Sequence, residues 1–202
     1  MRVAEKPDLP AEPVRFDFDD FVRYSENHPD GDFELLDGVI YELAPEGDAH
    51  LITRLTINTY LHQVLDLTKY TIGTEGSFPA PGWKEGPKPD NFVSRGALAQ
   101  TLRRPTSEDL LLVIEITTSP NTSEDDELKR KLATYARVGI PDYWLVDLVS
   151  ERVVVHRDPR ADTDPPRYAS VVAYGRNETI VALAVDRFTI ATDLLLQMAG
   201  KK

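Results

Sequence analysis

Two acidic residues stand where an acid is unusual. Glu115 lies inside the apolar run 110–117 (LLLVIEIT), and Asp90 follows Pro89 at the start of a shorter segment, DNFV. Burying a carboxylate without compensation is costly, so Glu115 needs a cation, a metal ion or an opening to solvent. Two carboxylates that meet repel each other unless a divalent cation lies between them. Taken singly, Glu115 could pair with an arginine at a strand end, and Asp90 could be an ordinary turn residue.

A basic cluster on the segment after Glu115 could complete a site for phosphoryl chemistry. Position 117 is a threonine, so a lysine two residues after the acid is missing, but the next helix offers Lys129, Arg130 and Lys131. Lys131 shares a helix face with Tyr135 at i, i+4 spacing. A lysine directed at a phosphate or an attacking water would stabilise the developing charge. The same residues could also form a solvated basic stripe.

The elements around these residues predict an α/β fold. The run 110–117 is typical of a strand buried on both faces. A helix is expected over about 124–138, ended by Gly139, and strands follow at 143–147 and 152–157. Strand, helix, strand order favours a mixed sheet flanked by helices.

The rest of the chain supplies the outer elements. Asp37-Gly38 in FELLDGVIYEL predicts an N-terminal hairpin, because both residues tolerate a positive φ. Helices are expected at about 17–27, 49–67 and from Thr192, and strands at 69–75, 90–93, 168–174 and 179–185. Residues 1–15 are rich in proline and charge and are predicted to be a loose arm. We expect residues 16–202 to form one domain.

Composition narrows the function classes. The chain has 202 residues, 41% of them hydrophobic, which suits one globular domain. No apolar run approaches the ~20 residues of a membrane helix, and we expect a cytoplasmic protein without a membrane partner. There is no cysteine, so a metal would have oxygen or imidazole ligands, and paired carboxylates suit Mg²⁺ or Mn²⁺. The net charge of −11 opposes tight, unassisted binding to DNA.

Taken in order, the motifs resemble one family. FELLDGVIYEL, Asp48-Ala49-His50, PDNFV, VIEITTSPNT and KLATYARVGIPDYWLVD are similar to the Uma-two family of bacterial restriction-endonuclease-like proteins. The resemblance runs from about Asp17 to Arg157, and YARVGIPDYWLVD is its most specific part. It implies the PD-(D/E)XK nuclease core, in which two acids bind Mg²⁺ and a lysine assists hydrolysis.

The resemblance also implies roles for four residues. Asp90 matches the aspartate of the family's PD motif, and Glu115 matches its second acid, so these two would bind the metal. Lys131 matches a lysine that has moved onto the following helix, with Thr117 at the vacated position. Glu34 matches an N-terminal acid that often joins such centres. Glu127 stands where the family usually has an aspartate, four residues before the lysine.

These observations lead to two function hypotheses. The first is an endonuclease that hydrolyses DNA phosphodiester bonds with Mg²⁺ or Mn²⁺, using Glu34, Asp90, Glu115 and Lys131. The alternative is a non-catalytic, homo-oligomeric interaction protein that keeps the nuclease fold. The resemblance implies a homodimer, and the apolar segments YWLVD and VVVHR suggest more hydrophobic surface than a small sheet can cover. His50 is expected to be a structural residue near a helix start, although a role close to the site is conceivable.

Overall fold

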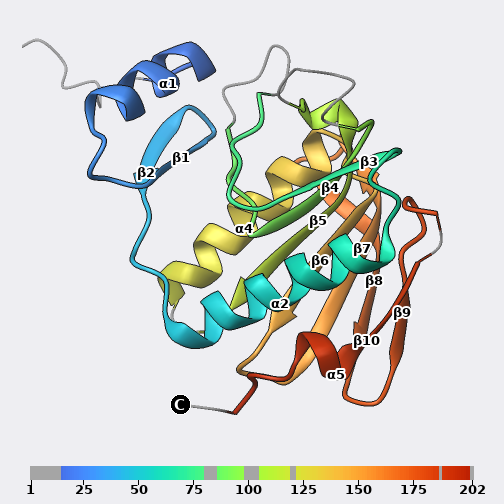
Figure 1. Ribbon diagram of the computed structural model, residues 1–202. Coiled ribbons are helices and arrows are strands. Elements are labelled where there is room, and N and C mark those ends of the chain that lie inside the picture. The colour runs from blue at the N-terminus through green and yellow to red at the C-terminus, as the bar shows by residue number, and fades with distance from the viewer. Residues whose placement is uncertain (1–14, 80–85, 98–104, 119–121, 187, 201–202) are drawn as a thin grey trace, which may run out of the picture.

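A six-stranded mixed sheet forms the centre of the protein. The computed structural model describes residues 15–79, 86–97, 105–118, 122–186 and 188–200. The strand order of the sheet is β3-β4-β5-β6-β7-β8 (Figure 1). The strands β5 and β6 pair in parallel, and the other neighbouring pairs are antiparallel. Their bounds are β3 (Tyr70–Gly73), β4 (Asn91–Arg95), β5 (Leu110–Thr117), β6 (Asp142–Asp147), β7 (Arg152–Arg160) and β8 (Arg167–Tyr174). This mixed sheet confirms the predicted fold class.

The central strand β5 behaves as its composition predicts, because all eight of its residues are buried. The helix α4 (Thr122–Arg137) connects it to its parallel neighbour β6. Gly139 follows the helix with a φ of +78°, the left-handed conformation that glycine adopts without steric cost. The crossover therefore matches the expected strand, helix, strand unit.

Each face of the sheet has its own core. On one face, α2 (Asp48–Val64), α5 (Thr192–Leu195) and the hairpin of β9 (Thr179–Val181) and β10 (Thr189–Ala191) pack on the sheet (Figure 1). On the other face lies α4, whose Tyr135 and Ala136 pack with Tyr143 and Tyr168. A short 3-10 helix, η1 (Ser107–Asp109), leads into β5.

The N-terminal elements form a separate small layer beside the sheet (Figure 1). The helix α1 (Phe18–Asn27) begins after Asp17, whose side chain accepts a hydrogen bond from the Asp20 amide. The hairpin of β1 (Phe33–Leu36) and β2 (Val39–Glu42) turns at Asp37 and Gly38, with φ of 49° and 73°. The expected hairpin is thus present. The predicted arm at residues 1–15 lies, except for its last residue, outside the described part of the chain.

The buried face of α2 differs in part from the one predicted by the apolar residues that recur at three- and four-residue steps, which are Leu51, Ile52, Leu55, Tyr60 and Leu61. Ile52 and Leu55 are 42% and 49% exposed, whereas Thr53 and Arg54 are buried beside Ile57 and Leu61. The polar pair tolerates burial because its hydrogen-bonding groups are satisfied: Thr53 bonds the Ala49 carbonyl, and Arg54 bonds carboxylates. The helix also ends at Val64 rather than at residue 67.

The apolar surface that was expected to need a second chain is covered within this one. Trp144, Val153 and Val155 are at most 1% exposed and belong to the core that includes β9, β10 and α5. Asp142 helps to hold this C-terminal segment, because it accepts hydrogen bonds from Arg157 and from the Leu183 amide. The surface argument for a homodimer was therefore wrong. Among the helices of the described residues, none has the length and apolar character required to cross a membrane.

Candidate active site

The sheet brings Asp90 and Glu115 to the same end. The strand β4 runs antiparallel to β5, so its start adjoins the end of β5, and Asn91 pairs with Ile114. Asp90 immediately precedes β4, and its Oδ2 accepts a 2.7 Å hydrogen bond from the amide of Ile116, the residue after Glu115. The topology alone thus places both acids together, as the sequence predicted.

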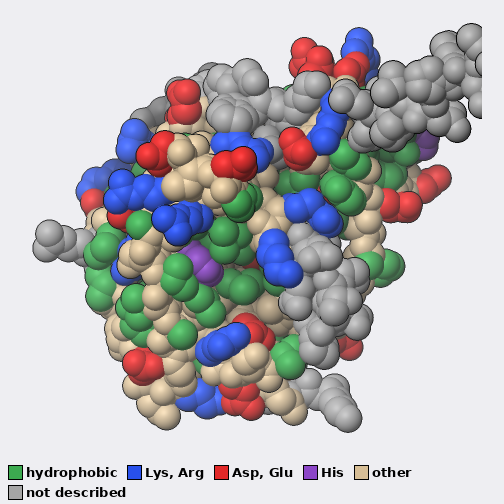
Figure 2. Space-filling view, turned by 180° about the vertical axis from the view of Figure 1, so that it is seen from behind, with side chains coloured by type: hydrophobic (Ala, Val, Ile, Leu, Met, Phe, Trp, Pro, Cys, Tyr) green, Lys and Arg blue, Asp and Glu red, His purple; other side chains and the backbone are tan. Residues whose placement is uncertain are grey.

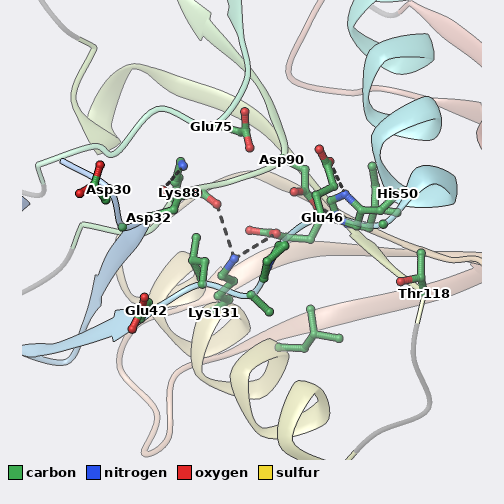
Figure 3. Close-up of a pocket in the computed structure, with 18 residues that line it drawn as sticks. Asp30, Asp32, Glu42, Glu46, His50, Glu75, Lys88, Asp90, Thr118 and Lys131 are labelled. Atoms are coloured by element: carbon green, nitrogen blue, oxygen red, sulfur yellow. Dashed lines mark hydrogen bonds and ion pairs between the residues drawn. The ribbon is translucent and has the colours of Figure 1, made fainter. Parts of the chain in front are cut away.

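A cavity of about 690 Å³ opens at this end of the sheet. Asp90, Glu115 and Lys131 line it, and Figure 3 shows Asp90 and Lys131 there. More carboxylates than cations contribute to its surface. Its charged or titratable lining residues are Asp30, Asp32, Glu42, Glu46, His50, Glu75, Lys88, Asp90, Glu115 and Lys131. Such a cavity attracts cations and repels a bare polyanion.

Lys131 reaches from α4 to two buried acids. Its Nζ lies 3.2 Å from Oε2 of Glu34 and 3.3 Å from Oε2 of Glu115, and the three side chains are at most 6% exposed. Glu34 comes from β1 and lies beneath the cavity surface. Of the other two candidate cations, Lys129 is exposed, and the Arg130 guanidinium lies 4.8 Å from the centre of the Tyr41 ring.

Glu115 is held on its other side by Tyr135, whose hydroxyl donates to Oε1 at 2.5 Å. Burial raises the pKa of Glu115 above its ordinary value, the Lys131 ammonium opposes this, and the charge of Asp90 adds to it. The Glu115 carboxylate therefore requires positive charge nearby to remain ionised. Tyr135 lies one helical turn after Lys131, so the i, i+4 spacing already indicated that the two share a face.

His50 contacts the site from the first turn of α2. Its Nε2 lies 3.1 Å from Oδ2 of Asp90, and its Nδ1 lies 2.6 Å from Oε1 of Glu46. Burial alone would lower the pKa of His50, but its contacts with Asp90 and then with Glu46 raise it to about 9. Of the two interpretations of His50, the structure favours the one close to the site, because the ring contacts Asp90.

Glu46, Arg54 and Glu75 were not expected at the site. Arg54 donates to both oxygens of Glu46 at 2.8 Å and lies 3.0 Å from Oε2 of Glu75. The hydrogen bond from Arg54 lowers the pKa of Glu46. Glu46 precedes His50 by four residues, but it lies before the helix begins, so helical spacing did not identify it. Arg54 lies on an amphipathic helix, and nothing in the sequence indicated that its side chain would be buried.

The cavity offers carboxylates as ligands for a divalent cation. Within the described residues, no group of three or more histidine, aspartate or glutamate side chains is arranged to hold a metal ion. Magnesium sites in enzymes, however, often use only one or two carboxylates, completed by water and substrate phosphates. Asp90 and Glu115 fit that smaller requirement. Both contacts of Asp90 described here use Oδ2, which leaves Oδ1 as the available ligand atom.

The six-stranded mixed sheet flanked by helices is a nuclease-like α/β fold. Residues 18–193 match the model of the Uma2 family, described as "Putative restriction endonuclease". The chain belongs to this family. Its fold is similar to that of a crystal structure described as "a putative nuclease belonging to DUF820 from Anabaena variabilis ATCC 29413". That likeness has a TM-score of 0.65 at 15% identity and covers 90% of this chain and 97% of the other. None of the curated proteins matches the sequence.

Proposed function

We propose that this protein is a divalent-cation-dependent endonuclease that hydrolyses phosphodiester bonds in DNA. The observation that carries the proposal is the position of Lys131, buried against Glu34 and Glu115 at a cavity that Asp90 also lines. Two acids and a lysine at the end of a central strand are the groups that metal-assisted phosphoryl transfer requires. Membership of the family described as "Putative restriction endonuclease" supports the same reaction.

Asp90 and Glu115 would hold Mg²⁺ or Mn²⁺. A divalent cation there would lower the pKa of a bound water and neutralise phosphate charge. Hydrogen bonds within the protein already orient both carboxylates in the absence of a metal ion. Tyr135 fixes one oxygen of Glu115, and the Ile116 amide fixes one oxygen of Asp90. Both carboxylates are therefore oriented in advance, which reduces the cost of binding.

Lys131 would supply positive charge that needs no cofactor. Its ammonium is buried and held by Glu34 as well as by Glu115. Glu34 therefore keeps Lys131 in place when Glu115 engages another partner. A fixed ammonium at the cavity stabilises negative charge on a phosphate oxygen more strongly than a mobile surface lysine does, because its side chain is almost completely buried.

The charge of the chain bears on how DNA would be bound. The net charge is −11, and on the face shown in Figure 2 lysine and arginine side chains are interspersed with acids. Phosphate neutralisation by basic residues supplies most non-specific DNA affinity. We therefore expect weak binding to free DNA and a strong dependence on divalent cations. We also propose that the protein acts in the cytoplasm.

A non-catalytic interaction protein is the second candidate. Both oxygens of Glu115 already have protein donors, Tyr135 and Lys131, as in a purely structural buried ion pair. A homodimer is proposed for either function and rests on the family resemblance, since the YWLVD and VVVHR segments are covered within the chain. Light scattering at micromolar concentration tests it: twice the chain mass supports the dimer, and one chain mass throughout contradicts it.

DNA cleavage distinguishes the two functions. The protein is incubated with single-stranded and double-stranded DNA in Mg²⁺, in Mn²⁺ and in excess chelator. The nuclease proposal predicts shortened products with either metal and none with chelator. A Lys131→Met variant that remains folded should cleave at a rate at least ~100-fold lower, the scale of losing one charge-stabilising group. Intact DNA under all conditions would favour the interaction protein.

A further inference from the structure

A chain of contacts leads from the middle of α2 to Asp90. Arg54 donates to Glu46, Glu46 contacts Nδ1 of His50, and Nε2 of His50 contacts Asp90. Figure 3 shows Glu46, His50 and Asp90 grouped together at the cavity. Each link is at most 3.1 Å long. The series therefore couples the start of α2 to the aspartate that precedes β4.

The anchor of this series is buried and held at several points. The Arg54 side chain is 9% exposed, and its guanidinium contacts Glu46, Glu75 and the Thr74 hydroxyl. An arginine fork that binds a carboxylate through two bonds fixes the direction as well as the position of that carboxylate. Glu46 is thus presented to His50 in one orientation.

The imidazole of His50 is fixed at both ring nitrogens. With Nδ1 directed to Glu46 at 2.6 Å, the ring is oriented so that Nε2 meets Asp90 at 3.1 Å. A carboxylate partner that orients a histidine is a common means of directing the other ring nitrogen at a functional group. The orientation of the His50 ring therefore directs Nε2 at Oδ2 of Asp90.

The contact with Asp90 selects one side-chain rotamer. Oδ2 of Asp90 accepts from the Ile116 amide at 2.7 Å and lies 3.1 Å from His50. Two donors on the same oxygen restrict rotation about the carboxylate, and they leave Oδ1 for another ligand. The Ile116 amide also lies next to Glu115 in the chain, so this rotamer places the two acids on one cavity.

We propose that His50, oriented by Glu46 and Arg54, is a positioning residue that holds Asp90 in the rotamer required to bind a divalent cation. The inference rests on the proposed function, in which Asp90 is a metal ligand. A purely structural role would be different: the same contacts would only attach α2 to the sheet, and their loss would reduce stability without altering the Asp90 side chain.

The Ile116 amide reports the Asp90 rotamer in metal-free protein. Its proton resonance and its hydrogen-exchange rate are measured by NMR in wild type, His50→Ala and His50→Gln. In His50→Ala we expect a shifted resonance and faster exchange, because Asp90 loses one of its two constraints. The glutamine variant should restore both values, since its side-chain amide can donate to Asp90. His62→Ala is the matched control, because His62 lies on the same helix and bonds only the Asn58 carbonyl among the described residues.

Calorimetric titration with Mn²⁺ measures the consequence. His50→Ala should bind ~10-fold more weakly than wild type, the usual scale for losing a group that orients a metal ligand, and His50→Gln should recover most of the affinity. The inference would be overturned if His50→Ala kept the wild-type Ile116 amide resonance, exchange rate and Mn²⁺ affinity. Tighter Mn²⁺ binding by His50→Ala would also overturn it, because it would mean that His50 only competes with the cation. Absence of Mn²⁺ binding in wild type would instead refute the proposed metal centre, and the Ile116 data would still decide whether His50 orients Asp90.

Discussion

The ammonium of Lys131 lies 3.3 Å from Oε2 of Glu115, and both side chains are almost completely buried. An ion pair in this environment offsets the cost of burying each charge, so the loss of one partner leaves the other uncompensated. Glu34 shares the same ammonium. Three buried charges therefore depend on one another.

Lys131→Met should destabilise the protein by about 3 kcal/mol, because it leaves two buried carboxylates without a cation. Urea unfolding at neutral pH measures this free energy. The double variant Lys131→Met, Glu115→Gln should recover part of the loss. Lys129→Met, an exposed neighbour on α4, is the control and should change stability by less than ~0.5 kcal/mol. Equal effects of the two single substitutions would contradict a buried charge cluster.

Asp142→Ala should also be strongly destabilising, by about 3–5 kcal/mol. Asp142 is fully buried and accepts from Arg157, Trp144 and the Leu183 amide. Its loss would leave three donors without an acceptor and detach the segment that carries β9 and β10. The exposed pair of Asp158 and Arg160 provides the comparison, since Arg160→Ala should cost at most ~1 kcal/mol. Thermal unfolding of both variants measures the difference, and similar midpoints would refute this role.

His156 should make the protein less stable in mild acid. Its ring lies among those of Tyr143 and Tyr168, at centroid distances of 5.1 and 5.8 Å, and burial lowers its pKa below 6.5. The native state therefore holds the neutral imidazole, whereas the unfolded chain takes up a proton as the pH falls below about 6.5. Stability contributed by His156 is present above that pH and is lost as the pH falls toward the lower, folded pKa.

The variant His156→Phe tests this assignment, since its ring cannot be protonated. The free energy of unfolding, measured between pH 7.5 and 5.5, should fall less steeply for the variant than for wild type. The exposed His62→Gln should keep the wild-type slope. A wild-type slope in His156→Phe would show that the acid sensitivity originates elsewhere.

The sequence predicted the centre of the fold well for a physical reason. A strand buried on both faces must be apolar throughout, so β5 and the single acid within it were conspicuous, and the glycine after α4 marked the end of that helix. The amphipathic helix α2 was harder, because its buried face carries Thr53 and Arg54 rather than Ile52 and Leu55. Polar residues can be buried when partners from distant segments satisfy them, and one sequence does not reveal those partners.

The same limit applies to the site. Glu115 was conspicuous because it is the one acid in an apolar strand. Asp90 and Lys131 were selected through the family resemblance, since the residues alone left Asp90 as a possible turn acid and offered Lys129, Arg130 and Lys131 as alternatives. The series from Arg54 through Glu46 to His50 could not be predicted, because it depends on how the segment before α2 folds back over the end of the sheet. The only signal in the sequence was the spacing of four residues between Glu46 and His50. Because Glu46 precedes the first residue of α2, this spacing did not indicate a shared helix face.

Manganese binding tests the central claim most directly. Calorimetric titration of Mn²⁺ is performed on wild type, Asp90→Asn, Glu115→Gln and Asp30→Asn, the last changing an exposed acid that lines the same cavity. We predict saturable binding to wild type and Asp30→Asn, and a loss of at least ~100-fold in affinity for Asp90→Asn and Glu115→Gln, because each removes an anionic ligand. Circular dichroism establishes that every variant remains folded. Wild-type affinity in folded Asp90→Asn and Glu115→Gln would contradict the account and place any metal centre elsewhere.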